Sequence, residues 1–238
     1  MIYGHVQRWL PGWLHRHLLH FDAVLDDAVR DFAGSIPVGA RVLDAGAGEA
    51  RHAQYFASHR YTPVDLAIGD DSWDYTRIQA LADLTALPFR SGVFAAALNI
   101  VTLEHVREPR QVVSELARVL EPGGRVLFVV PHEWEVHQAP HDYFRYTRYG
   151  LRHLLSQAGL EVEQLDPVGG YFWLMSRRLL NGLQFFPGLA FPIAALFLVP
   201  PALVLPWFDG LDKAKNFTLG YVCVARKPKQ KPAVSSHS

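Results

Sequence analysis

Apolar residues in this chain follow two periodicities that alternate along the sequence. Near-continuous apolar runs at 93–100 and 126–130 are typical of strands buried on both faces of a parallel sheet. Apolar residues with helical spacing at 22–32, 109–120 and 149–158 predict helices around these strands. This alternation favours an α/β fold with helices on both faces of the sheet.

Shorter segments complete the predicted sheet. The first of them leads into a glycine turn, from which we expect a helix beginning near Glu49 and running to about His59. The last two are expected to pair as antiparallel strands, although roughly fifty residues separate them. The five segments are 41–45, 61–65, 78–89, 159–165 and 216–226.

The long insert between the last two strands contains no charged residue from Leu179 to Phe208. A membrane-spanning helix needs ~20 apolar residues with satisfied backbone hydrogen bonds. The longest proline-free apolar stretch here is 193–199, so the sequence argues against a simple transmembrane segment and predicts short helical pieces that fold back as a hairpin. The interrupting prolines are Pro187, Pro192, Pro200, Pro201 and Pro206.

So large an apolar surface is unusual on a soluble monomer and needs a partner. Three interpretations stay open: a roof over an apolar acceptor pocket, a homodimer contact, or a segment that dips into a bilayer surface. The chain is accordingly a monomer or a homodimer. Four cations flank the insert and suit anionic lipid headgroups, namely Arg177, Arg178, Lys213 and Lys215.

Composition narrows the function classes. The 238 residues carry 23 Lys plus Arg and 23 Asp plus Glu, so no net field attracts nucleic acid. The single cysteine, Cys223, excludes an internal disulfide and fits a reducing compartment. Residues 1–20 lack the pattern of a signal peptide. They predict two short amphipathic pieces split at Pro11, interpreted as a helical arm on the core or as a membrane-interface segment.

The stretch 41–52 (RVLDAGAGEARH) is the most informative motif. Gly46 and Gly48 lack a Cβ, so the backbone turns sharply and a ligand approaches closely. A dinucleotide-binding motif has a third glycine at the position that Arg51 occupies here. Asp44 at the strand end repels a pyrophosphate but suits a ligand that carries ammonium and sulfonium charges.

These residues resemble motif I of the class I S-adenosylmethionine (SAM)-dependent methyltransferases. The segment 115–124 (ELARVLEPGG) is similar to the helix and turn of the Methyltransf_11-like branch of that family. The resemblance covers 36–170 and 216–226. It implies a Rossmann-like seven-stranded sheet of order 3-2-1-4-5-7-6 with strand 7 antiparallel, SAM as the cofactor, and methyl transfer as the reaction.

The resemblance also implies cofactor contacts. Asp65 corresponds to the acid that accepts the ribose hydroxyls, with a strand-end turn as the alternative role and Asp70 as a weaker rival. Asp83 corresponds to the acid at the adenine amino group, and Leu84 supplies a backbone N–H to the ring. The segment after the fourth strand is expected at the sulfonium end of SAM. Its two candidate residues are Asn99 and His105.

The loop 131–147 covers the methyl group in this fold and is rich in groups that move protons. His137, His141 and Asp142 are the catalytic candidates. The alternative is structural, with Asp142 pairing to Arg145 and Thr147 capping the next helix. Irregular spacing of the histidines argues against a metal site, and none is predicted.

The sequence therefore predicts an N-terminal arm at 1–35, a methyltransferase domain at 36–227 that includes the insert 171–215, and a disordered tail at 228–238. The expected acceptor is a small molecule, a glycan or a lipid-like compound, methylated at an oxygen. The expected location is the cytoplasm, at the inner face of the membrane, with peripheral contact through 179–208. Two other classes stay open: a non-catalytic SAM-binding membrane-associated protein and a nicotinamide-dependent oxidoreductase.

Overall fold

A computed structural model describes residues 12–70 and 72–229. Its centre is a seven-stranded sheet of order β3-β2-β1-β4-β5-β7-β6. β7 runs antiparallel to both of its neighbours, while the other pairs are parallel. The predicted order and the single reversed strand are confirmed. The strands are β1 (Arg41–Ala45), β2 (Arg60–Asp65), β3 (Ala80–Leu81), β4 (Phe94–Ile100), β5 (Leu120–Pro131), β6 (Glu161–Val168) and β7 (Gly220–Arg226).

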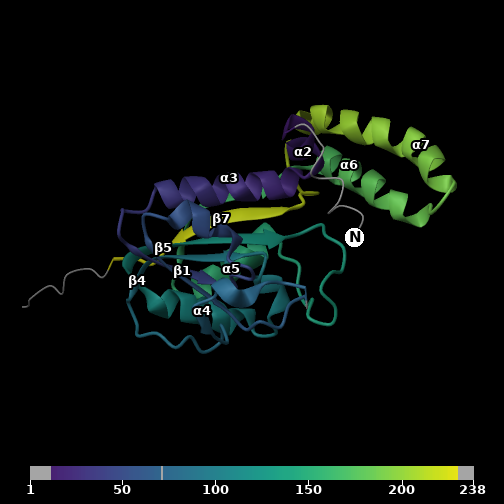
Figure 1. Ribbon diagram of the computed structural model, residues 1–238. Helices are drawn as coiled ribbons and strands as arrows, with labels where there is room; N and C mark the ends of the chain where they lie inside the picture. Colours follow the sequence, from purple (N-terminus) through teal and green to yellow (C-terminus); the bar gives the residue numbers. More distant parts are fainter. Residues whose placement is uncertain (1–11, 71, 230–238) are drawn as a thin grey trace, which may run out of the picture.

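Helices cover both faces of the sheet, giving three layers (Figure 1). Adjacent residues of a strand point to opposite faces, so Val42 and Leu43 belong to two different cores. Leu43 packs in the core beneath α4 (Pro109–Val119) and α5 (Arg148–Gln157). Val42 packs in the core beneath α3 (His20–Gly34). Both residues are fully buried, as the near-continuous apolar strands predict.

The segment after the glycine turn differs from the prediction. We expected a helix from about Glu49 to His59, and the structure has a short 3₁₀ helix, η2 (Arg51–Phe56). Ala50 at its start is left-handed, with φ of 53°, and caps nothing with its side chain. Positive φ angles at Gly48 and Ala50 use up the residues that would have formed the first α-helical turn.

The insert folds back as a hairpin, as predicted, and extends beyond the end of the sheet (Figure 1). α6 (Tyr171–Gly182) leads outward, η5 (Leu183–Phe185) follows it, and α7 (Ala190–Val204) returns into η6 (Leu205–Leu211). Residues 171–211 together form the hairpin α6–α7.

The expectation that prolines prevent a helix of spanning length is wrong. α7 contains both Pro200 and Pro201. Together with η6 it forms a 22-residue segment, Ala190–Leu211, that is long and apolar enough to cross a membrane by length and composition, and only 17% of its most apolar window is buried. A proline removes one backbone donor but keeps a helical φ, so two adjacent prolines near the end of α7 do not stop it.

The arm before α3 lies against the base of the hairpin. α2 (Gly12–Leu18) brings the ring Nε2 of His17 within 2.9 Å of the carbonyl oxygen of Leu203. The ring of His20 stacks on Trp173 with centroids 3.7 Å apart. An arm packed on the rest of the protein is thus present over residues 12–20, whereas the predicted first amphipathic piece lies in residues 1–11, outside the described part of the chain.

Candidate functional site

A cavity of about 450 Å³ opens at the carboxyl ends of the strands, where the order reverses between β1 and β4. Ligands bind at this position in open α/β sheets because connections leave the two strands in opposite directions. Its walls come from the turn after β1, the end of β2, the loops after β3 and β4, and the loop 131–147.

The glycine turn forms the wall next to β1. Gly46 has a φ of 85°, and a Cβ built on it would lie 2.2 Å from the Cγ2 atom of Thr102. The N–H groups of Gly46 and Ala47 both donate to the carbonyl oxygen of Val64, at 2.9 and 3.0 Å. A side chain at Gly46 therefore has neither the backbone angle nor the space it needs.

Asp65 ends β2 with its carboxylate on the cavity wall. Its Oδ2 atom accepts the N–H of Gly48 at 2.9 Å, and its Oδ1 atom accepts the N–H of Ala67 at 2.8 Å. Each carboxylate oxygen has a second lone pair, so the group still accepts hydrogen bonds from a ligand. The two backbone donors hold it in a fixed orientation. Asp65 thus combines the ligand-facing position with the strand-end turn that was its alternative role.

Asp83 and Leu84 lie on the same wall, after β3. The Oδ1 atom of Asp83 accepts both the N–H and the hydroxyl of Thr85, at 2.8 and 2.7 Å. The apolar side chains of Ile68 and Trp73 line the cavity nearby. A flat ring would therefore meet apolar surface on its faces and polar groups at its edge.

Two of the predicted cofactor contacts lie beneath the cavity instead of on its wall. Asn99 is fully buried, and its amide donates to the carbonyl oxygen of Ala45 at 2.9 Å, which ties β4 to β1. Asp44 is buried as well and accepts the hydroxyl hydrogen of Tyr61. Burial raises the pKa of the Asp44 carboxyl to about 7. Both side chains support the glycine turn from below.

The opposite wall contains histidines from two segments. His105, in η4 (Leu103–His105), and His137 and His141, in the loop 131–147, all line the cavity. The ring Nδ1 of His105 lies 2.5 Å from the carbonyl oxygen of His141, which joins the two segments. The ring Nδ1 of His141 lies 3.1 Å from the hydroxyl of Tyr143.

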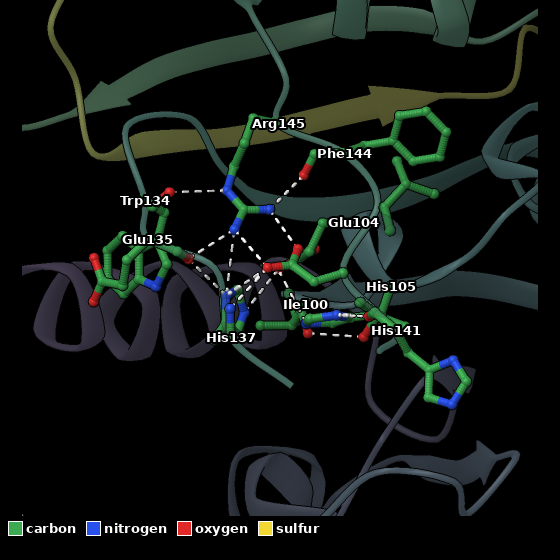
Figure 2. A network of polar contacts seen from close by, with 12 residues as sticks. Ile100, Glu104, His105, Trp134, Glu135, His137, His141, Phe144 and Arg145 are labelled. Atoms are coloured by element: carbon green, nitrogen blue, oxygen red, sulfur yellow. Dashed lines mark hydrogen bonds and ion pairs between the residues drawn. The ribbon is translucent and has the colours of Figure 1, made fainter. Parts of the chain in front are cut away.

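Glu104 lies behind these histidines and is fully buried (Figure 2). Neither carboxylate oxygen has a hydrogen-bond partner within residues 12–70 and 72–229. Its Oε1 atom is 3.7 Å from Nε2 of His105 and 3.9 Å from Nε2 of His137. Burial raises the pKa of Glu104 to about 8, and burial also lowers the pKa of His105.

Asp142 and Arg145 hold the loop in shape. The guanidinium of Arg145 donates to both carboxylate oxygens of Asp142, at 2.5 and 2.8 Å. It also donates to the carbonyl oxygen of Glu135 at 2.7 Å (Figure 2). This pairing holds the pKa of Asp142 far below its usual range. Asp142 also accepts the backbone N–H of His137 at 2.8 Å and does not line the cavity. Its position matches the structural role rather than the catalytic one.

The comparisons with known proteins agree with this geometry. A family model described as "Methyltransferase domain" matches residues 43–128. The ubiquinone biosynthesis O-methyltransferase of Xylella fastidiosa (strain 9a5c) is 33% identical over 172 residues, which cover 59% of this chain and 69% of that protein. The chain belongs to the class I SAM-dependent methyltransferases.

Other similar proteins match different shares of this chain. The demethylmenaquinone methyltransferase of Renibacterium salmoninarum is 34% identical over 105 residues, 42% of this methyltransferase and 44% of that protein, so the match spans less than half of that relative. A putative methyltransferase from Bacillus halodurans C-125 has a TM-score of 0.57 at 15% identity, covering 86% of this chain and 99% of its own. The latter likeness shows the fold alone.

SAM is the cofactor of this family, and the cavity fits it. Gly46 and Gly48 line it with a turn of positive φ angles, and Asp65 presents a fixed carboxylate for ribose hydroxyls. Asp83 and Leu84 stand where an adenine edge would be held. Of the predicted cofactor residues, the structure brings these five and His105 to the cavity wall.

The residues that the sequence reasoning did not single out include Trp73, Trp134 and Glu104. Trp73 and Trp134 line the cavity from loops whose periodicity carries no signal. Glu104 stands next to the predicted His105, and that adjacency was the available signal. Nothing in the sequence alone indicates that its carboxylate is buried.

Proposed function

We propose that this methyltransferase transfers a methyl group to an oxygen atom of a lipid-like acceptor at the cytoplasmic face of a membrane. The observation that carries the proposal is the exposed hairpin α6–α7, whose charge-free stretch runs from Leu179 to Phe208. Relatives named for ubiquinone and demethylmenaquinone act on compounds of this apolar kind, which supports the acceptor class.

The hairpin exposes apolar side chains on more than one side. Leu189 is 92% exposed, Phe197 70% and Trp207 79%. α7 is apolar around its whole circumference, a pattern found in helices surrounded by protein core or by lipid. A dimer contact would cover one side of such a hairpin and leave the other in water. A bilayer accommodates all sides, so we favour lipid over a second subunit.

The fold limits how the hairpin meets a bilayer. The hairpin leaves the sheet from β6 and returns to β7, and these two strands pair along their length. Both ends of the insert must therefore stay on one side of a membrane. The 12 residues of α6 extend ~18 Å, about three fifths of the ~30 Å hydrocarbon layer. We infer a hairpin that enters one leaflet and returns.

The cations that flank the charge-free stretch 179–208 are less available than the sequence suggested. Arg177 and Arg178 pair with the carboxylate of Glu135, at 2.5 and 2.9 Å, and Lys215 pairs with Asp209. These pairs reduce what the cations contribute to headgroup binding. Membrane contact should consequently depend on apolar burial, at ~25 cal/mol per Å², more than on anionic lipid.

The base of the hairpin is joined to the cavity. The guanidinium of Arg177 lies 3.5 Å from the ring centroid of Trp134, and Trp134 lines the cavity. A membrane at the hairpin would thus lie near the acceptor side of the site. An apolar acceptor would reach Trp134 with little exposure to water.

The chain's residues then align the acceptor and remove its proton. SAM supplies a methyl group on a sulfonium sulfur, and the bond between them breaks with its electron pair on sulfur as the acceptor oxygen attacks. His141 lines the cavity with one ring nitrogen held by Tyr143, so its other nitrogen serves as the base for the acceptor hydroxyl. The fixed loop excludes water and positions the reacting groups.

The test uses methyl-labelled SAM and membranes from cells that lack the protein. Purified enzyme should label a lipid-extractable product, and mass spectrometry should find its unmethylated precursor accumulating in the deficient cells. Label only in water-soluble products would contradict a lipid-like acceptor. No transfer to any extract, despite SAM binding, would favour the non-catalytic alternative.

A further inference from the structure

Glu104 is the most unusual residue of the site that the methyl-transfer chemistry leaves unused. Its side chain is completely buried, and both oxygens lack a hydrogen-bond partner among the described residues. An unpaired buried carboxylate is costly, and such groups often mark an ion or water that completes them. The two nearest ring nitrogens belong to His105 and His137.

The two imidazole rings have the arrangement of metal ligands. His105 directs Nδ1 to a carbonyl oxygen, that of His141, at 2.5 Å. His137 directs Nδ1 to the carbonyl oxygen of Glu135 at 3.2 Å and lies 3.5 Å from Oδ2 of Asp142. A hydrogen bond from Nδ1–H fixes the tautomer and leaves Nε2 free to bind a metal. Metal-bound histidines usually make such a hydrogen bond with their other ring nitrogen.

The three side chains converge. One ligand atom from each of Glu104, His105 and His137 lies within 4.8 Å of the other two. Oε1 of Glu104 is 3.7 Å from Nε2 of His105 and 3.9 Å from Nε2 of His137. Ligand atoms ~2.1 Å from a tetrahedral ion lie about 3.4 Å apart, so small side-chain rotations would complete the site. The backbone segments that carry the ligands are already joined by the hydrogen bond between His105 and His141.

We propose that Glu104, His105 and His137 bind one divalent transition-metal ion, with an open coordination position that faces the cavity. Two histidines and one carboxylate suit zinc, iron or manganese, and three protein ligands leave a position for a water or a substrate oxygen. Resting on the proposed function, the inference places the acceptor hydroxyl at that open position.

The ion gives the acceptor oxygen two advantages. It fixes the oxygen beside the cavity, and it stabilises the oxygen anion so that the hydroxyl loses its proton near neutral pH. The proton passes to His141. The oxygen then forms its bond to the methyl carbon, and the bond from that carbon to sulfur breaks with the electron pair on sulfur. Charge and atoms balance, with no redox partner required.

The first experiment measures metal binding without acceptor or SAM. Full-length enzyme, stripped with chelator and dialysed, is titrated with Zn²⁺ in a calorimeter and with Co²⁺ in a spectrophotometer. We expect one ion per chain and a visible Co²⁺ absorption. Glu104→Gln and His137→Ala should each weaken binding by ~100-fold or more. His153→Ala, which changes an exposed histidine on α5, should bind like the unmodified protein.

Thermal unfolding establishes that each variant is folded. If Glu104→Gln fails to fold, His137→Ala still tests the site, because His137 lies in a loop. Equal Zn²⁺ affinity in the unmodified protein and in the folded variant would mean an adventitious ion only and would overturn the site.

The second experiment compares the rate of methyl transfer by the metal-stripped enzyme before and after Zn²⁺ is restored. A rise of at least ~10-fold is expected. Equal rates would overturn the acceptor-binding role. Absent metal binding would leave lipid labelling unaffected, so the two proposals fail separately.

Discussion

At the scale of single residues, Asp65 is the side chain whose environment most directly matches a ligand contact. Its carboxylate is held by the N–H groups of Gly48 and Ala67 and faces the cavity. Asp65→Ala removes a charged acceptor, and we expect SAM affinity to fall by ~1–3 kcal/mol in calorimetry. Asp65→Asn keeps one acceptor oxygen and should lose less. Unchanged affinity in both variants would contradict the ribose contact.

Asp44 links protonation to stability. Its pKa is raised from 3.8 to about 7 because the carboxyl is buried, so the folded protein holds a proton that the unfolded chain releases near pH 4. Stability should therefore fall as pH rises from about 4 to 7, by up to ~1.4 kcal/mol per pH unit. Asp44→Asn keeps an acceptor for Tyr61 and should flatten this fall.

Urea unfolding of the ligand-free protein at several pH values between about 5 and 7.5 measures the effect. The Asn variant should gain stability over the unmodified protein as the pH increases, by ~2 kcal/mol across this interval. Parallel stability curves would show that Asp44 does not carry its proton in the fold.

At the scale of elements, the loop 131–147 is a wall of the cavity that carries the proposed base, His141. The pairs of Arg145 with Asp142 and of Arg177 with Glu135 fix its course, while His141 remains at the cavity surface. His141→Ala should lower the turnover number by ~10²-fold and leave SAM affinity unchanged, because the residue acts on the acceptor proton.

The matched control for His141→Ala is Tyr143→Phe, which removes the hydroxyl near the ring Nδ1 and keeps the imidazole. It should reduce turnover less. Steady-state kinetics of the three proteins on the labelled lipid product measure both effects. A full rate in His141→Ala would return the loop to a purely structural role.

At the scale of the whole molecule, the hairpin α6–α7 determines where the enzyme works. Full-length protein should sediment with neutral and anionic liposomes alike, and about 0.5 M salt should release little of it, because the neighbouring Arg177 and Arg178 are already paired. Replacement of 179–208 by a short Gly/Ser linker should abolish sedimentation and keep SAM binding. A monomer that stays in the supernatant would make the hairpin a wall of the acceptor site.

The sequence by itself determined the sheet and its glycine turn. Buried strands need apolar runs, and the positive φ of 85° at Gly46 favours glycine, so both constraints can be read from the local sequence. The resemblance to the methyltransferase family assigned Asp65, Asp83 and Leu84, which lie at the end of β2 and just after β3. The hairpin was also predictable in outline from its apolar composition.

Only the tertiary structure decided which polar groups meet. Asp44 and Asn99 lie one residue before the ends of β1 and β4, whereas Asp65 is the last residue of β2. Asp44 and Asn99 are buried beneath the turn, where they contact Tyr61 and the carbonyl oxygen of Ala45. Glu104 and His137 are far apart in sequence and meet because η4 and the loop 131–147 cross the same strand ends. Local periodicity records burial and turn geometry, whereas contacts between distant loops depend on how the whole sheet places them.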